Sequence, residues 1–217
     1  MSKHYNVVIA TPGHSVQICY LKSLMKTVEY LNNKGLTYCL VSEYSSSVAT
    51  ARELTALGTS ERGLDFQTTS VLGGASYEKI FWIDSDMEWE VEDFKNLLKS
   101  PLSVVSGLYV LDEAGTVAVG YLGDGGLPTR VNKVEFLLHS EPVEVYGVGF
   151  GFLAVKSGVF ESIGRPWFGI GKVEVEGLKW NLGEDYSWCV KAKMAGHKIY
   201  VDPTVKVGHN KNVIFRP

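Results

Sequence analysis

Short apolar runs alternate with segments of helical periodicity along the first half of the chain, and this alternation restricts the possible folds more than any other feature. Residues 5–12 (YNVVIATP) have the composition of a buried strand, and the Pro12-Gly13 pair that closes the run is typical of a loop. In residues 15–35, apolar side chains recur at helical spacing. Ser15 is a candidate cap for this helix.

The same succession repeats along the next segment. Residues 36–44 (LTYCLVSEY) predict a second strand, and residues 45–58 predict a serine-capped helix that ends at Gly58. Residues 77–86 (YEKIFWIDSD) predict a third strand. Strand, helix, strand, helix in this order is typical of an α/β layer built on a parallel sheet.

The second half of the chain has a different pattern. After a short amphipathic helix at 91–99 and a strand at 102–110, residues 115–155 combine glycines with alternating β-formers, which predicts a smaller antiparallel or mixed region. Residues 183–196 predict a helix, and residues 198–209 predict two last strand pieces around Pro203. Because no repeat, low-complexity tract or linker interrupts the sequence, we expect one domain over residues 1–217.

Composition excludes several classes of protein. The 217 residues carry a formal net charge of -3, so no basic field is available to hold a nucleic-acid backbone. Cys19, Cys39 and Cys189 are widely spaced without a CxxC pair, which indicates reduced thiols and a reducing compartment such as the cytoplasm. The apolar runs are shorter than the roughly 18 residues that a membrane span needs.

The third predicted strand ends in two carboxylates that are separated by one residue. Asp84 and Asp86 in Asp84-Ser85-Asp86 come at the carboxyl end of a strand, where ligands of parallel sheets gather. Two like charges at one place repel each other unless a cation lies between them, and carboxylate oxygens suit Mg²⁺ or Mn²⁺. Alternatively, Asp86 only caps the helix that starts near Val91, and Asp84 is solvated.

Glu184 and Asp185 fall at the start of the last long predicted helix, after Gly183. Negative charge is favoured there by the helix dipole, so an acidic pair at this position is common without any chemistry. A carboxylate held rigidly at that position is also suited to act as a general base.

Three further residue types have contexts that fit a ligand site. His209 follows a strand near the C-terminus, where a histidine is usually just exposed, but its imidazole would make a third ligand for Mn²⁺. Arg52 lies on the helix after the second strand and is either solvated or in contact with a diphosphate or ribose. Trp167 and Trp180 lie on glycine-flanked loops, where they either stack on sugar faces or pin the loop to the core.

Taken in this order, these pieces resemble the metal-dependent GT-A-fold glycosyltransferases. The resemblance extends from the VVIATP strand through the two aspartates and residues 147–168 to residues 183–209, and thus covers nearly the whole chain. The small size and the closing NVIFRP are similar to compact virus- and phage-encoded members, such as a chlorella-virus glycosyltransferase domain.

The resemblance implies a fold and a reaction. The fold would be a single Rossmann-like α/β domain, with a mostly parallel central sheet flanked by helices. Residues from about 1 to 110 would bind the nucleotide, and residues from about 111 to 217 would bind the acceptor and carry out catalysis. The reaction would move a sugar from a nucleotide-sugar donor, with a UDP-sugar such as UDP-glucose favoured, to a hydroxyl of a glycan or glycoprotein acceptor in glycan biosynthesis. It would depend on Mn²⁺ or Mg²⁺.

The resemblance also implies roles for residues of the donor side. Thr11, Pro12 and Arg52 match positions that line the nucleotide pocket, and Gly149 matches the strand beneath the donor sugar. The helix reads Ala-Arg-Glu where many relatives have Ala-Arg-Asn, so Glu53 departs from the family pattern.

Asp84, Ser85 and Asp86 match the family's DxD motif, in which the second carboxylate is usually the direct metal ligand and the first is often nearer the ribose. His209 matches the C-terminal metal ligand. On the acceptor side, Asp185 matches the catalytic base of inverting members, with Glu184 as the second choice.

Two other functions remain open from the sequence. A sugar-1-phosphate nucleotidyltransferase would share the α/β sheet and an acidic metal site, but residues 11–17 (TPGHSVQ) lack the lysine and arginine expected of its phosphate loop. A non-catalytic carbohydrate-binding module could use Trp167 and Trp180 without the acidic motifs. The sugar, the acceptor and a place within a longer multidomain protein are also left open.

Overall fold

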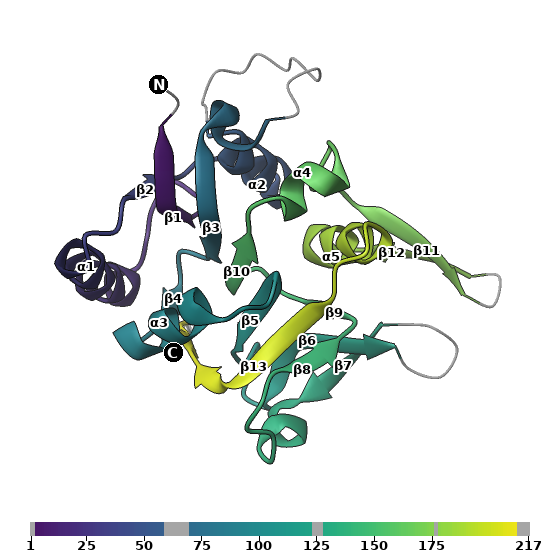
Figure 1. Ribbon diagram of the computed structural model, residues 1–217. Helices are drawn as coiled ribbons and strands as arrows, with labels where there is room; N and C mark the ends of the chain where they lie inside the picture. The colour runs from purple at the N-terminus through teal and green to yellow at the C-terminus, as the bar shows by residue number, and fades with distance from the viewer. Residues whose placement is uncertain (1–2, 59–69, 123–127, 176–177, 212–217) are drawn as a thin grey trace, which may run out of the picture.

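A mixed seven-stranded sheet runs through the computed structural model, which describes residues 3–58, 70–122, 128–175 and 178–211 (Figure 1). The strand order is β2-β1-β3-β10-β5-β13-β8. The strands are β1 (His4–Ala10), β2 (Tyr38–Val41), β3 (Ser76–Ile83), β5 (Val104–Leu108), β8 (Val143–Val145), β10 (Phe152–Lys156) and β13 (Ile199–Lys206).

Most of these strands run in the same direction. β1 is parallel to β2 and β3, and β5 is parallel to β13. β10 is antiparallel to both of its neighbours, β3 and β5, and β8 is antiparallel to β13. The expected mostly parallel α/β sheet is thus confirmed. Because β10 from the second half of the chain lies between β3 and β5 from the first, the two halves share one sheet.

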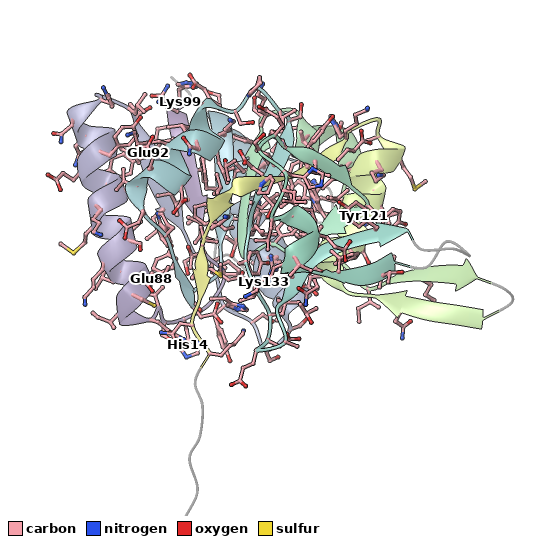
Figure 2. The ribbon with its side chains drawn as sticks, turned by 90° about the horizontal axis from the view of Figure 1, so that it is seen from below. His14, Glu88, Glu92, Lys99, Tyr121 and Lys133 are labelled. Atoms are coloured by element: carbon pink, nitrogen blue, oxygen red, sulfur yellow. The ribbon has the colours of Figure 1, made fainter. Side chains whose placement is uncertain are left out.

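Helices cover both faces of the sheet (Figure 1). α1 (Ile18–Asn33) and α3 (Val91–Lys99) lie on one face, and α2 (Val48–Leu57), α4 (Val159–Ile163) and α5 (Glu184–Met194) lie on the other. α3, which carries the labelled Glu92, lies beside α1 in Figure 2. Alternate strand residues point to opposite faces, so Val7 and Ile9 pack under α1, whereas Val8 and Ala10 pack under α2.

Smaller pairings complete the fold. β6 (Thr116–Leu122), β7 (Pro128–Asn132) and β9 (Gly147–Val148) form the expected antiparallel region, and the hairpin β11 (Gly171–Val175) and β12 (Leu178–Leu182) projects from the body in both figures. β4 (Met87–Glu88) pairs with β14 (Gly208–His209). Two short 3₁₀ turns are η1 (Val71–Gly74) and η2 (Lys133–Phe136).

Local sequence explains several helix ends. The Ser47 hydroxyl accepts a hydrogen bond from the Thr50 amide at 3.4 Å at the start of α2, as expected, and the helix ends at Gly58 with φ at 68°, a left-handed conformation that favours glycine. At α3, Glu90 is the N-cap and forms a capping box with Asp93. Asp86 does not cap this helix, so that alternative is wrong.

Two predicted elements differ from the observed ones. α1 begins at Ile18 with Gln17 as the N-cap residue, so Ser15 does not cap it. β13 is one strand that continues through Pro203, rather than two pieces around it. The pairing of β13 with β5 skips from Asp202 to Lys206, and this irregularity accommodates a residue that has no amide hydrogen to donate.

The described residues contain no helix that is both long and apolar enough to cross a membrane. Cys19, Cys39 and Cys189 are all free thiols.

Candidate functional site

Asp84 and Asp86 lie on a tight turn at the carboxyl edge of the sheet, directly after β3. The turn is closed by the Met87 amide, which donates to the Asp84 carbonyl at 3.1 Å. The Asp84 amide donates to the Gly151 carbonyl at 3.0 Å, just before β10. The parallel strands and the antiparallel β10 therefore bring residues from both halves of the chain to the same edge.

Arg52 joins the first aspartate to the acidic pair of α5. Its Nη2 lies 3.2 and 3.3 Å from the two carboxylate oxygens of Asp84, and its Nε lies 3.3 Å from Oε1 of Glu184. The guanidinium also lies over the ring of Phe150, 5.0 Å from its centroid. Arg52 is 5% exposed, so this buried cation fixes Asp84 and Glu184 in place.

Asp86 has two cationic partners. Its Oδ2 lies 3.2 Å from Nε2 of His209 and 3.2 Å from Nζ of Lys211. Burial alone would raise the pKa of the Asp86 carboxyl, but hydrogen bonds and charges from His209 and Lys211 outweigh burial and hold the pKa below its usual range. The chain itself thus supplies the cations that separate the two aspartates.

A backbone carbonyl orients His209. Its Nδ1 lies 2.9 Å from the Val110 carbonyl oxygen, an acceptor only, so Nδ1 carries the hydrogen. Nε2 therefore donates to Asp86 when the ring is protonated and offers a lone pair when the ring is neutral. The hydrogen bond to Asp86 raises the pKa of His209 above its ordinary value. Metal-binding histidines are commonly held in this way by a carbonyl behind the ring.

The donor atoms at this place suit a divalent cation. Asp86 and His209 contribute one oxygen and one nitrogen, and Mg²⁺ or Mn²⁺ usually takes only one or two carboxylates from the protein and fills its remaining positions with waters and substrate phosphates. No cluster of three or more His, Cys, Asp or Glu side chains suited to a metal ion occurs among the described residues. The carboxylate of Asp84 is engaged with Arg52 instead.

Asp185 is half-buried in the first turn of α5. Its Oδ1 accepts a hydrogen bond from the Tyr186 amide at 2.7 Å. Burial, followed by the negative charge of Glu184, raises the pKa of the Asp185 carboxyl above its ordinary value, against the opposing charge of Arg52. Glu184 and Asp185 therefore differ: the first is ion-paired to Arg52, and no side-chain cation lies within ion-pairing distance of the second among the described residues.

Two cavities meet at the aspartates. The larger cavity has a volume of about 360 Å³ and extends from the aspartates to Asp185. Its lining consists of Arg52, Asp84, Asp86, Tyr109, Leu111, Val117, Ala118, Gly149, Phe150, Gly183, Asp185, Tyr186, His209 and Lys211. A second recess of about 300 Å³ lies on the other side, lined by Pro12, Gly13, Tyr44, Ser45, Val48, Ala51, Arg52, Asp84, Ser85 and Asp86.

No protein-family model and no curated protein matches this sequence. Among solved structures, A197 from STIV is 18% identical with a TM-score of 0.51, over 98% of this chain and 97% of that one. GalNAc-T7, solved with UDP, GalNAc and Mn²⁺, is 14% identical with a TM-score of 0.58, over 96% of this chain and 44% of that one. This chain thus spans less than half the length of GalNAc-T7.

The chain has the GT-A fold. A glycosyltransferase involved in the glycosylation of the major capsid of PBCV-1 also matches, at 16% identity and a TM-score of 0.32, over 74% of this chain and 68% of that one. At 18% and 14% identity, the likeness to A197 and GalNAc-T7 is a likeness of fold.

Within the GT-A fold, the residues predicted for the nucleotide pocket divide into two groups. Pro12, Ser85 and Arg52 line the second recess. Thr11 lines neither cavity: it is 3% exposed, and its hydroxyl hydrogen-bonds with the Tyr20 hydroxyl of α1. The place of Thr11 in the nucleotide pocket stays a prediction, and its side chain continues the face of β1 that packs under α1.

The predicted acceptor residues do not form an exposed aromatic surface among the described side chains. Trp167 is fully buried, and its Nε1 donates to the Phe160 carbonyl at 2.9 Å. Its proposed stacking on a sugar is wrong, and the alternative that it pins its loop to the core is what the structure shows. The side chain of Trp180 lies outside the described residues.

Glu53, where the chain departs from the family pattern, has a structural role. Its carboxylate accepts hydrogen bonds from Nε of Arg165 at 2.8 Å and from the Phe168 amide at 2.9 Å. The loop between α4 and β11 is thereby fastened to α2, next to Arg52. An asparagine at position 53 could not offer two carboxylate oxygens to these donors.

Sequence reasoning missed three residues with polar side-chain groups that line the larger cavity. Tyr109 directly follows β5 at the same sheet edge as the aspartates, so the strand-end rule could have found it. Tyr186 follows Asp185, but nothing in its local sequence separates it from a core tyrosine. Lys211 reaches Asp86 only because β14 pairs with β4, a two-residue pairing that no pattern predicts.

Proposed function

We propose that this chain is a metal-dependent, inverting glycosyltransferase that moves a sugar from a nucleoside-diphosphate donor, with UDP-sugars such as UDP-glucose favoured, to a hydroxyl of a glycan or glycoprotein. One observation carries the proposal. The Asp86–His209 pair and the half-buried Asp185 line the same cavity, and the aspartates of the turn line both that cavity and a second recess. A donor and an acceptor need this arrangement to meet at one carbon atom.

The nucleoside would occupy the second recess, against Pro12 and Ser85, and the diphosphate would lie at the turn. Arg52 and Lys211 lie at the turn, where their guanidinium and ammonium groups could donate hydrogen bonds to phosphate oxygens. Asp86 and His209 would hold Mn²⁺ or Mg²⁺, with Asp84 as the third candidate ligand. When bound, such an ion acts as a Lewis acid for the charge that develops on the departing diphosphate.

Asp185 is the better candidate for the general base. Glu184 forms an ion pair with Arg52, which favours its ionised form but directs its carboxylate to a cation. Asp185 has its carboxylate in the larger cavity and a pKa raised by burial. A base whose pKa lies nearer to neutral pH accepts a proton more effectively. Asp185 would take the proton of the acceptor hydroxyl, and attack from the face opposite the diphosphate would invert the anomeric carbon.

The two halves of the chain would bind different ligands. The second recess is lined only by residues of the first 110, which fits a nucleotide-binding half. The larger cavity adds residues from β6, from the turn before β10 and from α5, which fits an acceptor-binding and catalytic half. The shared sheet would keep the two halves in fixed register.

Ligand-dependent thermal unfolding tests the proposal, because a ligand that binds only the folded state raises the midpoint. The purified chain would be heated with Mn²⁺ and UDP-, GDP- or dTDP-sugars. A midpoint raised by one sugar nucleotide and Mn²⁺ together, followed by release of the nucleoside diphosphate with a glycan acceptor, is expected. A response to a nucleoside triphosphate with a sugar 1-phosphate would instead indicate a nucleotidyltransferase. A response to free sugars alone would indicate a binding module.

A further inference from the structure

Tyr109 lies at the floor of the larger cavity, and neither the two acidic motifs nor the proposed base accounts for it. It directly follows β5 and is 6% exposed. Its hydroxyl accepts a hydrogen bond from the Gly151 amide at 3.0 Å. Its ring stands edge-on to the ring of His209, with centroids 5.4 Å apart. Tyr109 therefore contacts both the turn before β10 and the metal-site histidine.

The glycines of that turn leave room for the hydroxyl. A Cβ added to Gly149 would overlap Oη of Tyr109, and one added to Gly151 would lie 2.7 Å from Cζ and 2.8 Å from Oη. Real side chains do not approach each other this closely, so a residue with a side chain at position 149 or 151 would collide with Tyr109. The Gly151 carbonyl in turn accepts from the Asp84 amide at 3.0 Å. The single residue Gly151 thus links the Tyr109 hydroxyl to the Asp84 backbone.

Among the residues that the structure describes, none accepts the hydroxyl hydrogen of Tyr109. The oxygen already receives the Gly151 amide, and no other hydrogen-bond partner lies within reach among the described residues. Because its oxygen already accepts from the Gly151 amide, the hydroxyl is left to act as a donor toward a ligand in the cavity. A buried donor without an acceptor costs free energy, which a ligand oxygen would recover.

The surroundings of this donor suit an uncharged ligand group. The side chains of Leu111, Val117 and Ala118 line the same cavity, whereas the cations Arg52 and Lys211 lie at the aspartates. A phosphate would gather at those cations. A sugar ring, which combines apolar C–H faces with hydroxyl oxygens, fits an apolar wall that carries the neutral hydroxyl of Tyr109.

We propose that Tyr109 donates its hydroxyl hydrogen to a hydroxyl oxygen of the transferred sugar, and so helps to determine which donor sugar the site accepts. This inference rests on the proposed glycosyltransferase function and deepens it. A site built to hydrogen-bond a hydroxyl discriminates against a sugar that lacks it, because the buried protein group is then left without a partner.

Binding measurements on Y109F test the proposal. Calorimetric titrations with Mn²⁺ would compare UDP with UDP-glucose, UDP-galactose and UDP-N-acetylglucosamine, and use the sugar nucleotide that wild type binds best. Y109F should bind UDP within about twofold of wild type and bind the sugar nucleotide roughly 3–10-fold more weakly, the scale of one neutral hydrogen bond. Donors that each lack one sugar hydroxyl should include one that wild type binds more weakly but Y109F does not.

Two further variants keep the test decisive. Y77F removes the same atom from another buried tyrosine, whose hydroxyl donates to Glu161 at 3.0 Å at the far end of β3, and should change neither affinity. G149A keeps the hydroxyl but displaces it, and should also weaken the sugar nucleotide more than UDP.

Equal losses for UDP and the sugar nucleotide in both Y109F and G149A would mean that Tyr109 only supports the turn, and this would overturn the inference. Unchanged sugar-nucleotide affinity in Y109F would do the same. A wild-type chain that binds no UDP-, GDP- or dTDP-sugar would overturn the proposed function and, with it, this inference. The wild-type titration therefore separates the two failures.

Discussion

Nε2 of His209 lies 3.2 Å from Oδ2 of Asp86. The contact joins β14, near the end of the chain, to the turn after β3, and the pairing of β14 with β4 holds the two segments together. A nitrogen and an oxygen ligand for a divalent cation are thus brought together by backbone hydrogen bonds. The metal-dependence of the site can be tested at each of the two residues.

Asp86→Asn should abolish Mn²⁺-dependent binding of the sugar nucleotide while leaving the chain folded. The amide keeps the size of the side chain but removes the charge that attracts the cation. Isothermal titration with and without Mn²⁺ measures the effect. Asp202→Asn, on the half-buried bulge of β13 away from both cavities, is the matched control and should bind like wild type. Donor affinity that still responds to Mn²⁺ in Asp86→Asn would remove Asp86 from the metal site.

His209→Ala should weaken Mn²⁺ binding about 10–100-fold, the usual cost of losing a ligand or its immediate support. The position of His209 near the C-terminus suggested an exposed side chain, but the side chain is only 8% exposed. The variant should therefore also lose some stability in the absence of metal. His197→Ala, whose ring contacts Ser162 on the other side of α5, serves as the control. Equal Mn²⁺ affinity in all three proteins would show that His209 has only a packing role.

Lys79→Met should lower the free energy of unfolding by about 2 kcal/mol. Lys79 is a buried lysine in β3, and its ammonium donates to three carbonyl oxygens at the end of α3, those of Leu97, Leu98 and Ser100, at 2.7–2.8 Å. The substitution leaves these helix-end carbonyls without their donor. Urea unfolding measures the change. Lys156→Met, which removes one exposed contact to the Pro101 carbonyl, should lower the free energy of unfolding by less than about 1 kcal/mol. Equal losses of stability in the two variants would contradict the role given to the Lys79 ammonium.

Asp185→Asn should raise the unfolding temperature at pH 7, and the gain should shrink as the pH falls toward 4. The folded-state pKa of Asp185 is raised above its unfolded value, mainly by burial. The folded chain then holds this proton more tightly than the unfolded chain, so ionised Asp185 lowers stability above its folded pKa. That cost disappears below the unfolded pKa.

Asp112→Asn provides the opposite sign in the same pH series. Hydrogen bonds from Thr116 hold the pKa of Asp112 below its ordinary value, so its ionised form stabilises the fold at pH 7 and the variant should melt lower there. Both differences should vanish in acid. A gain for Asp185→Asn that does not change with pH would mean that its buried charge is not the cause.

The sheet and the acidic turn could be predicted from the sequence because they depend on local signals. A run such as IFWIDSD is apolar on both faces and ends in two aspartates, which indicates a buried strand and its ligand edge. Ser47 and Gly58 mark the ends of α2 in the same direct way. These features are decided within a few residues, so a periodicity argument reaches them.

The rest depends on contacts between distant segments, which local patterns do not carry. The aspartates appeared to need an external cation, but Arg52 and Lys211 from α2 and the last segment already neutralise them. Trp167 looked like an exposed loop residue, but the packing of α4 against α5 buries it. Thr11 lies at a strand end, as the nucleotide pocket requires, but its side chain points to the face of the sheet that α1 covers.

The central claim is that Asp185 accepts a proton during sugar transfer, and product formation by purified Asp185→Asn tests it most directly. The amide keeps the shape of the side chain but cannot take the proton of the acceptor hydroxyl. Donor and Mn²⁺ binding should survive, since Arg52, Asp86 and His209 are untouched, while transfer should fall roughly 10²–10⁴-fold. Glu184→Gln should cost less, because adjacent helix residues point about 100° apart and Glu184 faces Arg52. Full transfer by Asp185→Asn, or a product that NMR shows to retain the anomeric configuration of the donor, would contradict the account.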